Sequence, residues 1–332
     1  MLTKLLSSQS IVFVILFNIS SISIVKAQAL ADVTAAFNST SNKPTVFHLK
    51  KNSFKIPVGG HLQGIQAVGD SEIVITASSA SFSYFITAEL NMQTGKGKIN
   101  NLQKISNSPY RHAGGCQVNK DILIVGIEDN QQKDKSRIVM VSFSDTLDTR
   151  YAETGYYHIS SIIERGGTVK RSTAGAVGFT KIKSGQYLVA VGDWDSRNID
   201  FYLSKSWSGQ LIDFYLTKSW SGQLFDSLTT FTAVKNKKWP SYQSINLLCD
   251  TNGRIYLIGF ALDGLNNRAD LFEVSAKSEA AYLRPVATRN FKCKGGAGFR
   301  YGSGIYVTPT GQLSIYSCGR NVSAHTPINI FK

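Results

Sequence analysis

Two histidines stand at corresponding places in two similar segments of the chain. His61 opens the segment His61-Leu-Gln-Gly-Ile-Gln66, and His112 opens the segment His112-Ala-Gly-Gly-Cys-Gln117. Neutral imidazole nitrogens can hold a divalent metal, or one ring can act as a general base while its neighbour stabilises charge. We therefore predict that His61 and His112 are catalytic, with a divalent metal as the cofactor to test. The alternative is that the two rings hydrogen-bond to neighbouring polar groups and water in a polar channel.

Polar residues near the starts of these and similar segments are suited to binding a ligand. Arg111 precedes His112, and its planar guanidinium can pair with an anionic group. Amide and phenol side chains supply further hydrogen-bond donors and acceptors. The predicted ligand-binding residues are Gln63, Gln66, Arg111, Gln117, Gln243, Asn246 and Tyr301.

The densest polar cluster lies in residues 192–197. Asp193 and Asp195 are two positions apart there, within reach of one hard cation. The segment lacks the further oxygen ligands of a calcium loop. Two interpretations stay open: a weak metal site formed by Asp193 and Asp195, or a structural ion pair between Asp193 and Arg197.

The four cysteines permit two disulfide bonds in an oxidising compartment. Cys116 and Cys249 lie in apolar strand patterns that are typical of buried thiols. Cys293 and Cys318 flank turn-rich segments, and we predict a disulfide bond between them.

The elements that must position these residues follow from a repeat. Three more segments, beginning at Thr173, Ser241 and Tyr301, resemble the two histidine segments. The fourth position of each segment is small, and these positions recur every 51 to 68 residues: Gly64, Gly115, Ala176, Ser244 and Gly304. Small residues are expected where backbones approach one another closely, as strands do around an axis.

Each segment is followed by a turn and a second apolar strand. Examples of that strand are Ile122–Gly126, Tyr187–Gly192 and Ile255–Gly259, in which β-branched and aromatic residues dominate. A third strand follows in most units. The sequence therefore predicts an all-β fold made of repeating units of three or four strands.

A tandem duplication lengthens the third unit. Residues 199–211 (IDFYLSKSWSGQL) are followed at once by residues 212–224 (IDFYLTKSWSGQL). We predict that the duplicated segment 199–224 forms an extruded hairpin or loop. The alternative is a ligand-binding loop that presents Trp207 and Trp220.

Units of this size and strand content resemble the β-propeller superfamily, in particular its secreted five-bladed members. The resemblance covers nearly all of the chain after residue 29, but it is architectural and brings no named functional family and no catalytic residues. It implies a ring of five blades, and a ring needs closure. The last unit runs out at Pro327–Phe331, so we predict that Thr45–Leu49 supplies its fourth strand.

Residues 1–29 have the pattern of a secretory signal peptide. Lys4 supplies a positive charge, an apolar stretch runs over residues 11–25, and Ala27-Gln28-Ala29 offers a cleavage site. A membrane anchor is the alternative, but polar residues interrupt the stretch and a span needs about 20 apolar residues. We predict cleavage near Ala27 or Ala29, a secreted or periplasmic location, no stable membrane span, and a single propeller domain over residues 30–332.

The chain is basic, with a formal net charge of +14. Such a surface attracts anions, but the lysines are scattered through predicted loops, which does not favour nucleic acid. The predicted partner is an extracellular small molecule, a glycan or a protein, and the predicted state is a monomer. Aromatic faces that can stack on sugars are expected at Trp207, Trp220 and Trp239.

Three functions are compatible with these features. We predict an exported binding module for an extracellular or periplasmic ligand, anionic or carbohydrate in character. The alternative is an exported hydrolase or lyase that uses His61 and His112 at the channel mouth, since only two of the five segments carry histidine and a single asymmetric site suits catalysis. A scaffold with no ligand in its channel is the third.

Overall fold

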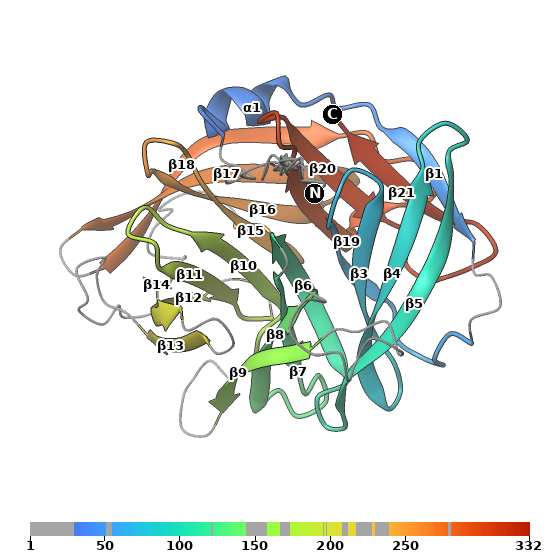
Figure 1. The fold of residues 1–332 in the computed structure, drawn as a ribbon, viewed down its shortest axis with the longest axis horizontal. Coiled ribbons are helices and arrows are strands. Elements are labelled where there is room, and N and C mark those ends of the chain that lie inside the picture. Colours follow the sequence, from blue (N-terminus) through green and yellow to red (C-terminus); the bar gives the residue numbers. More distant parts are fainter. Residues whose placement is uncertain are drawn as a thin grey trace, which may run out of the picture.

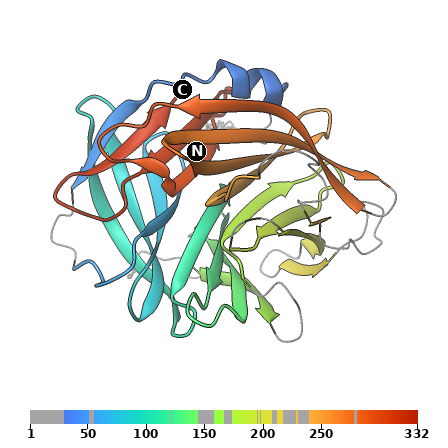
Figure 2. The same cartoon turned by 180° about the vertical axis from the view of Figure 1, so that it is seen from behind.

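The computed structural model describes residues 30–50, 55–120, 122–143, 158–166, 173–194, 196, 198–207, 212–216, 228–229, 239–277 and 280–332. This part of the chain contains one short helix, α1 (Val33–Ser39), and is otherwise built from strands. Figures 1 and 2 show the sheets following one another around a common centre.

Three of the sheets are separate and antiparallel. The first contains β6 (His112–Asn119), β7 (Ile122–Glu128), β8 (Lys135–Ser142) and β9 (His158–Gly166). The second contains β10 (Ala176–Lys181), β11 (Tyr187–Gly192), β12 (Asn198–Trp207), β13 (Ile212–Leu216) and β14 (Leu228–Thr229). The third contains β15 (Ser244–Cys249), β16 (Ile255–Asp263), β17 (Asn266–Lys277) and β18 (Ala280–Phe291).

The remaining strands form one closed path. One antiparallel run consists of β2 (Leu62–Ala67), β3 (Glu72–Ser78), β4 (Phe82–Asn91) and β5 (Lys96–Asn107). The other consists of β19 (Gly298–Val307), β20 (Leu313–Cys318), β21 (Thr326–Phe331) and β1 (Thr45–Lys50). Parallel pairing joins the two runs, through Ser303 and Gly64 on the inside and through β1 and β5 on the outside.

The second strand of each unit is buried over most or all of its length. Every residue of β7, β11 and β20 is buried, and β7 and β11 are almost continuous apolar runs without the alternation of a half-exposed strand. This pattern arises because each sheet has a neighbouring sheet on both faces.

Apolar clusters fill the space between successive sheets. Val74 and Phe85 of the first run pack with Val125 of β7, and Ile124 packs in turn with Val189 of β11. Further clusters join β10–β12 to β15–β17, β15–β17 to β19–β21 and α1, and β19–β21 to β1–β5. The core is therefore a ring of interfaces between sheets.

The small residues of the repeat lie where the inner strands crowd. A Cβ atom added to Gly64 would lie 2.7 Å from the Cys116 nitrogen, and one added to Gly304 would lie 1.8 Å from the Ile65 oxygen. These positions have no room for a side chain, which confirms the prediction made from the repeat.

The N-terminal strand closes the ring. In β1, Phe47 pairs antiparallel with Ile328 of β21, and Leu49 pairs parallel with Gly97 of β5. The predicted closure is therefore confirmed, with an additional outer seam to β5. Sheets arranged around a centre, packed face to face and locked by a strand from the other end of the chain define a β-propeller.

The two copies of the duplicated segment pair with each other. The first copy lies in β12, and the second begins with β13, which runs antiparallel to it with Trp207 opposite Ile212. The described part of the duplication is thus a hairpin at the edge of its sheet. Residues 208–211 and 217–224 lie outside the described residues.

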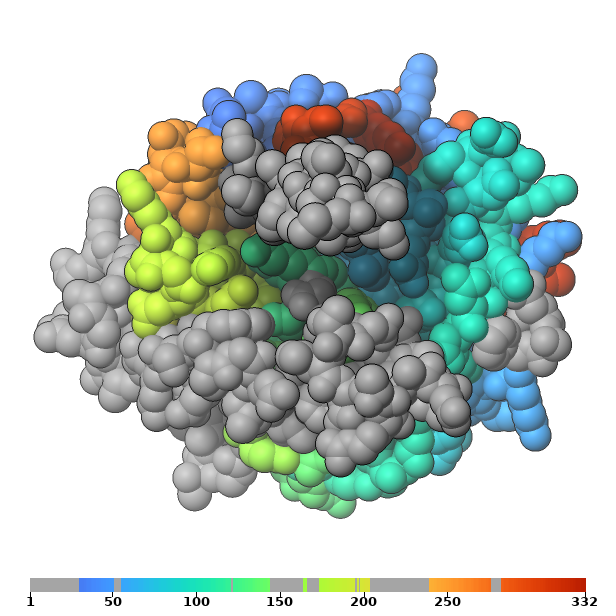
Figure 3. All heavy atoms as spheres, in the orientation of Figure 1, coloured from blue at the N-terminus to red at the C-terminus, as the bar shows by residue number. Residues whose placement is uncertain are grey.

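Figure 3 shows α1 and the C-terminal strands along one side of the ring and β4 and β5 along the adjacent side. In the described part of the chain, no helix has the length and apolar character needed to cross a membrane.

Candidate functional site

A cavity of about 300 Å³ opens at one end of the central channel. The residues that line it stand at the starts of inner strands or at the ends of the strands paired with them. They are His61, Gln63, His112, Glu128, Gly175, Trp194, Gln243, Arg300, Tyr301 and Arg320. The repeat therefore brings one end of every sheet to the same mouth, and it brings together the predicted residues His61, Gln63, His112, Gln243 and Tyr301.

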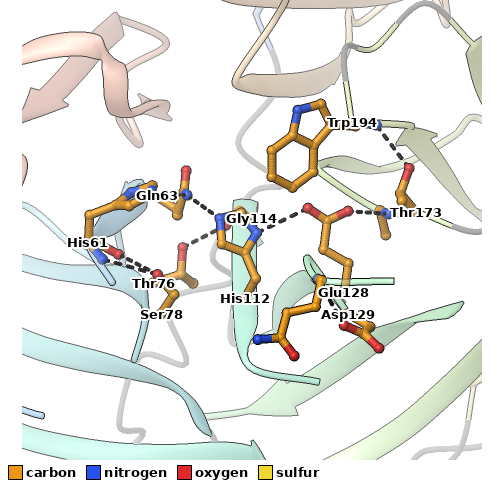
Figure 4. Close-up of polar contacts among 12 residues, drawn as sticks. His61, Gln63, Thr76, Ser78, His112, Gly114, Glu128, Asp129, Thr173 and Trp194 are labelled. Carbon is orange, nitrogen blue, oxygen red and sulfur yellow. Dashed lines mark hydrogen bonds and ion pairs between the residues drawn. The ribbon is translucent and has the colours of Figure 1, made fainter. Parts of the chain in front are cut away.

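His112 and Glu128 form a buried pair. They face each other in the register of β6 and β7, and His112 Nδ1 lies 3.0 Å from Glu128 Oε1. The other carboxylate oxygen accepts a hydrogen bond from the Ala174 backbone N–H at 3.0 Å. Glu128 is fully buried, so both of its oxygens are committed to holding the His112 ring and the start of the next sheet (Figure 4).

Gln63 bridges the two histidines through one amide nitrogen. Its Nε2 lies 2.7 Å from His112 Nε2 and 3.3 Å from His61 Nε2. His61 Nδ1 lies 3.1 Å from the Leu62 carbonyl oxygen, which can only accept, so this nitrogen carries the proton. In the neutral ring, Nε2 then accepts from the Gln63 amide, and the second amide N–H reaches His112 Nε2. His112 therefore carries its proton on Nδ1, directed at Glu128.

His61 sits in an environment that opposes its protonation. Burial lowers the pKa of His61 below its ordinary value, and the nearby His112, Arg320 and Arg300 lower it further, while the Leu62 carbonyl acts in the opposite direction. The backbone of His61 is held by Ser78, whose hydroxyl accepts from the His61 N–H at 3.0 Å. The ring is therefore a neutral hydrogen-bonding group at neutral pH.

Trp194 places an aromatic face at the cavity. Its ring stacks on His112 with centroids 5.4 Å apart, and Lys133 Nζ lies 4.0 Å from the Trp194 ring centroid. The Trp194 backbone N–H donates to Thr173 Oγ1 at 3.0 Å, which fixes the turn that carries it. The residue is 39 % exposed, although both His112 and Lys133 lie over its ring.

Two arginines line the cavity from the C-terminal run of strands. Arg300 lies in β19 beside Tyr301, and Arg320 follows β20. Both are exposed, and neither has an acidic partner among the residues that the structure describes. The described lining thus has two guanidinium groups and one carboxylate, Glu128, which pairs with His112.

Other predicted ligand-binding residues lie outside the cavity lining. Gln66 Nε2 donates to the Cys116 carbonyl at 3.0 Å and to Asn246 Oδ1 at 3.3 Å. Gln117 Oε1 accepts from the Leu247 N–H at 2.8 Å. These buried amides link inner strands of different sheets. This matches the alternative that polar side chains hydrogen-bond to one another in a polar channel.

Arg111 and Trp239 also have structural contacts. Arg111 Nη1 donates to the Ala80 carbonyl at 2.7 Å and does not line the cavity. The Trp239 ring, expected to be exposed, packs against Tyr242 and Phe272 and donates from Nε1 to the Ser196 carbonyl. The ring is therefore partly buried at the interface between the second and third separate sheets. Trp220 lies outside the described residues.

The predicted metal and disulfide sites are not assembled in the described residues. Asp193 Oδ2 accepts from Asn198 Nδ2, while Asp195 and Arg197 lie outside the described residues. Within the ranges given above, no group of three or more His, Cys, Asp or Glu side chains is placed to hold a metal ion. Cys293 and Cys318 are free thiols, and Cys293 Sγ lies 3.5 Å from Ser317 Oγ, so the disulfide stays a prediction.

Sequence reasoning missed five residues of the cavity: Glu128, Gly175, Trp194, Arg300 and Arg320. Glu128 could have been found from the sequence, because the antiparallel pairing of β6 with β7 places Glu128 opposite His112. No sequence pattern points to Arg300 and Arg320, because their place at the cavity depends on how the β19–β21 run packs against the β2–β5 run.

No family model and no curated protein sequence matches the chain. Among solved structures, a GH43 β-xylosidase/α-arabinofuranosidase from a compost microbial metagenome has 11% identity and a TM-score of 0.45, over 82% of this chain and 90% of that one. A GH43_1 enzyme from Xanthomonas citri, complexed with xylose, has 8% identity and a TM-score of 0.46, over 90% and 92%. An exo-β-1,3-galactanase from Clostridium thermocellum has 12% identity and a TM-score of 0.46, over 85% and 62%.

These values describe a likeness in the arrangement of strands alone. The assignment of the chain rests on its own pairings and core: it is a β-propeller whose channel mouth holds a histidine–glutamate pair, a half-exposed tryptophan and two arginines.

Proposed function

We propose that the chain is an exported binding module whose channel-mouth cavity takes a small anionic ligand with a sugar-like ring. The observation that carries the proposal is the pair of guanidinium groups, Arg300 and Arg320, which line a cavity and have no acidic partner in the described residues. Guanidinium groups pair with carboxylates and phosphates through two parallel hydrogen bonds, so an anion is the matching ligand.

The size and the remaining lining support a ring-shaped ligand. The cavity volume of about 300 Å³ falls at the small end of the range for ligand pockets. Trp194 contributes a partly exposed indole from another sheet, and Gln243 and Tyr301 add polar groups. A single sugar residue with an acidic group would use all of these.

The first test compares galacturonate with galactose by isothermal titration calorimetry. We expect galacturonate to bind and galactose to bind at least about 10-fold more weakly, because hydrogen bonds to charged groups contribute about 1.5–3 kcal/mol. The double variant Arg300→Gln/Arg320→Gln should lose this difference.

The matched control is Lys96→Gln/Lys98→Gln, which removes the same charge from exposed positions of β5. It should bind as the unmodified protein does. Equal affinity for galacturonate and galactose would show that the cavity does not recognise the carboxylate. Equal loss in both double variants would show that general surface charge is responsible.

The His112–Glu128 pair favours a second candidate, a hydrolase or lyase acting in the same cavity. A histidine whose Nδ1 is held by a carboxylate presents Nε2 as a proton acceptor, and the carboxylate stabilises the imidazolium that forms. In this structure Gln63 occupies that Nε2, so catalysis requires a ligand that displaces the Gln63 amide.

A further inference from the structure

We propose that the cavity cleaves uronate-containing glycans by β-elimination, with His112 as the base, Arg300 and Arg320 as the groups that hold the uronate carboxylate, and Tyr301 as the proton donor. This inference rests on the proposed function of the same cavity. It names the substrate class, a glycan with a carboxylate on the sugar ring, and the reaction.

Hydrolysis of a glycosidic bond by the usual route needs two carboxyl groups on either side of that bond. Among the described residues that line the cavity, Glu128 is the one carboxylate, and its oxygens are engaged with His112 Nδ1 and the Ala174 N–H. Asp129 is buried next to it and caps its own turn by accepting from the Gln131 N–H. No carboxyl group of the described lining faces the cavity as an acid or nucleophile.

Elimination needs a different set of groups, and the cavity contains them. A base must remove the proton from the carbon that bears the carboxylate, and cationic donors must stabilise the charge that then develops on the carboxylate. The His112–Glu128 pair supplies the base, and the two guanidinium groups supply the charge. Tyr301 follows Arg300 in β19, and its hydroxyl has no partner among the described residues, so it is available to the departing oxygen.

The reaction balances without a co-reactant. His112 Nε2 takes the proton, and the electrons of that C–H bond form a double bond to the adjacent ring carbon. The bond from that carbon to the glycosidic oxygen breaks, and the oxygen takes the proton of the Tyr301 hydroxyl. The proton on His112 returns through solvent to the Tyr301 phenolate. The products are a shortened glycan and an unsaturated uronate.

Gln63 controls access to the base. It is buried, and its amide bonds to both histidines in the structure. A bound uronate must displace the Gln63 amide from His112 Nε2. The amide can then keep its hydrogen bond to His61 Nε2. Gln63 and Glu128 are therefore positioning residues, because they act through His112.

The test incubates the full chain with galacturonate trisaccharide, with galactose trisaccharide as the neutral control. We expect ultraviolet absorbance from the conjugated carbon–carbon double bond to rise together with reducing ends, with the acidic substrate only. His112→Gln should lower the rate by at least about 100-fold, the usual contribution of a general base. His48→Gln, an exposed histidine of β1, should leave it unchanged.

The positioning role of Glu128 has its own readout. Glu128→Gln should lower kcat and leave KM for the trisaccharide unchanged, because the carboxylate orients the base and does not touch the substrate. Galacturonate binding by calorimetry shows that each variant keeps its folded cavity. If Glu128→Gln binds normally and retains full kcat, the role assigned to the His112–Glu128 pair is wrong.

The outcomes separate this inference from the proposed function. Binding of galacturonate without any cleavage of galacturonate, glucuronate or mannuronate trisaccharides overturns the elimination and leaves the binding function standing. New reducing ends without ultraviolet absorbance indicate hydrolysis and also overturn it. Binding of galactose 6-phosphate but not galacturonate identifies a phosphate ester as the ligand, which overturns the uronate class. No binding to any acidic sugar overturns both proposals.

Discussion

At the scale of single residues, Gln63 decides where the protons of the site lie. One amide nitrogen donates to Nε2 of both histidines, which leaves His61 Nδ1 to the Leu62 carbonyl and His112 Nδ1 to Glu128. Both rings then present acceptors toward each other and toward the cavity. This arrangement is stable only while the rings are neutral, because a protonated Nε2 has no acceptor in the Gln63 amide nitrogen.

A pH dependence of stability follows from His61. Burial lowers its pKa below the ordinary value of 6.5. Above pH 6.5 the ring is neutral in the folded and unfolded chain. Below pH 6.5 the unfolded chain takes up a proton that the folded chain does not, so the free energy of unfolding falls until the pH passes the lower pKa of the folded protein. Urea titrations at several pH values would measure this fall.

His61→Gln should flatten that part of the profile, because it removes the titrating group. His325→Gln, in an exposed position, is the matched control and should leave the slope as it is. An unchanged slope in His61→Gln would show that other groups cause the loss of stability at low pH.

The residues of the site were predictable to different degrees. His61, His112 and Tyr301 stand at the first repeat position, and Gln63 and Gln243 stand at the third. A repeat position becomes a place around the ring once the units are arranged as a propeller. The arginines could not be found in this way, because an exposed arginine next to a strand looks like any solvated charge. Gln66, Gln117 and Asn246 were grouped with the cavity because a repeat register does not give depth along the channel.

At the scale of elements, small residues and apolar runs specify the fold. The inner strands carry Gly or another small residue where they meet, and second strands such as β7 and β11 are almost continuous apolar runs. Both features are visible in the sequence, so the all-β class and the closing strand were predictable. The pairing of β1 with β5 was not, because it depends on the curvature of the closed ring.

Gly304→Ala tests the crowding of the inner strands. The new Cβ would lie 1.8 Å from the Ile65 oxygen and 2.0 Å from Gln66 Nε2, so β19 and β2 must move apart. We expect a loss of about 2–3 kcal/mol in the free energy of unfolding, measured by urea denaturation. Gly69→Ala, where an added Cβ would meet nothing within 4 Å, should change stability much less. Similar losses in both variants would contradict the crowding argument.

At the scale of the whole molecule, β1 makes a ring out of a row of sheets. It pairs with β21 on one side and with β5 on the other, so residues from the two ends of the domain share one hydrogen-bonded path. Phe47 anchors this strand in the apolar cluster between the β2–β5 run and the β19–β21 run. Opening this seam would expose apolar faces on two sheets at once.

Phe47→Ala should therefore destabilise the whole domain. The side chain is 2 % exposed, and truncating a buried phenylalanine costs about 3–5 kcal/mol. Thr45→Ala, an exposed position of the same strand, should cost far less. The comparison uses the urea midpoints of the two variants, and a midpoint for Phe47→Ala close to that of the unmodified protein would mean that the ring does not depend on this seam.

The hairpin of β12 and β13 has a consequence for how this chain changes over generations. The second copy of the duplicated segment adds to the outer edge of its sheet, and no inner strand has been inserted. A gene that gains or loses whole copies there lengthens or shortens one sheet outward, while the circumference of the ring and the cavity at its centre keep their dimensions. We therefore expect changes in the number of copies to leave the channel mouth as it is.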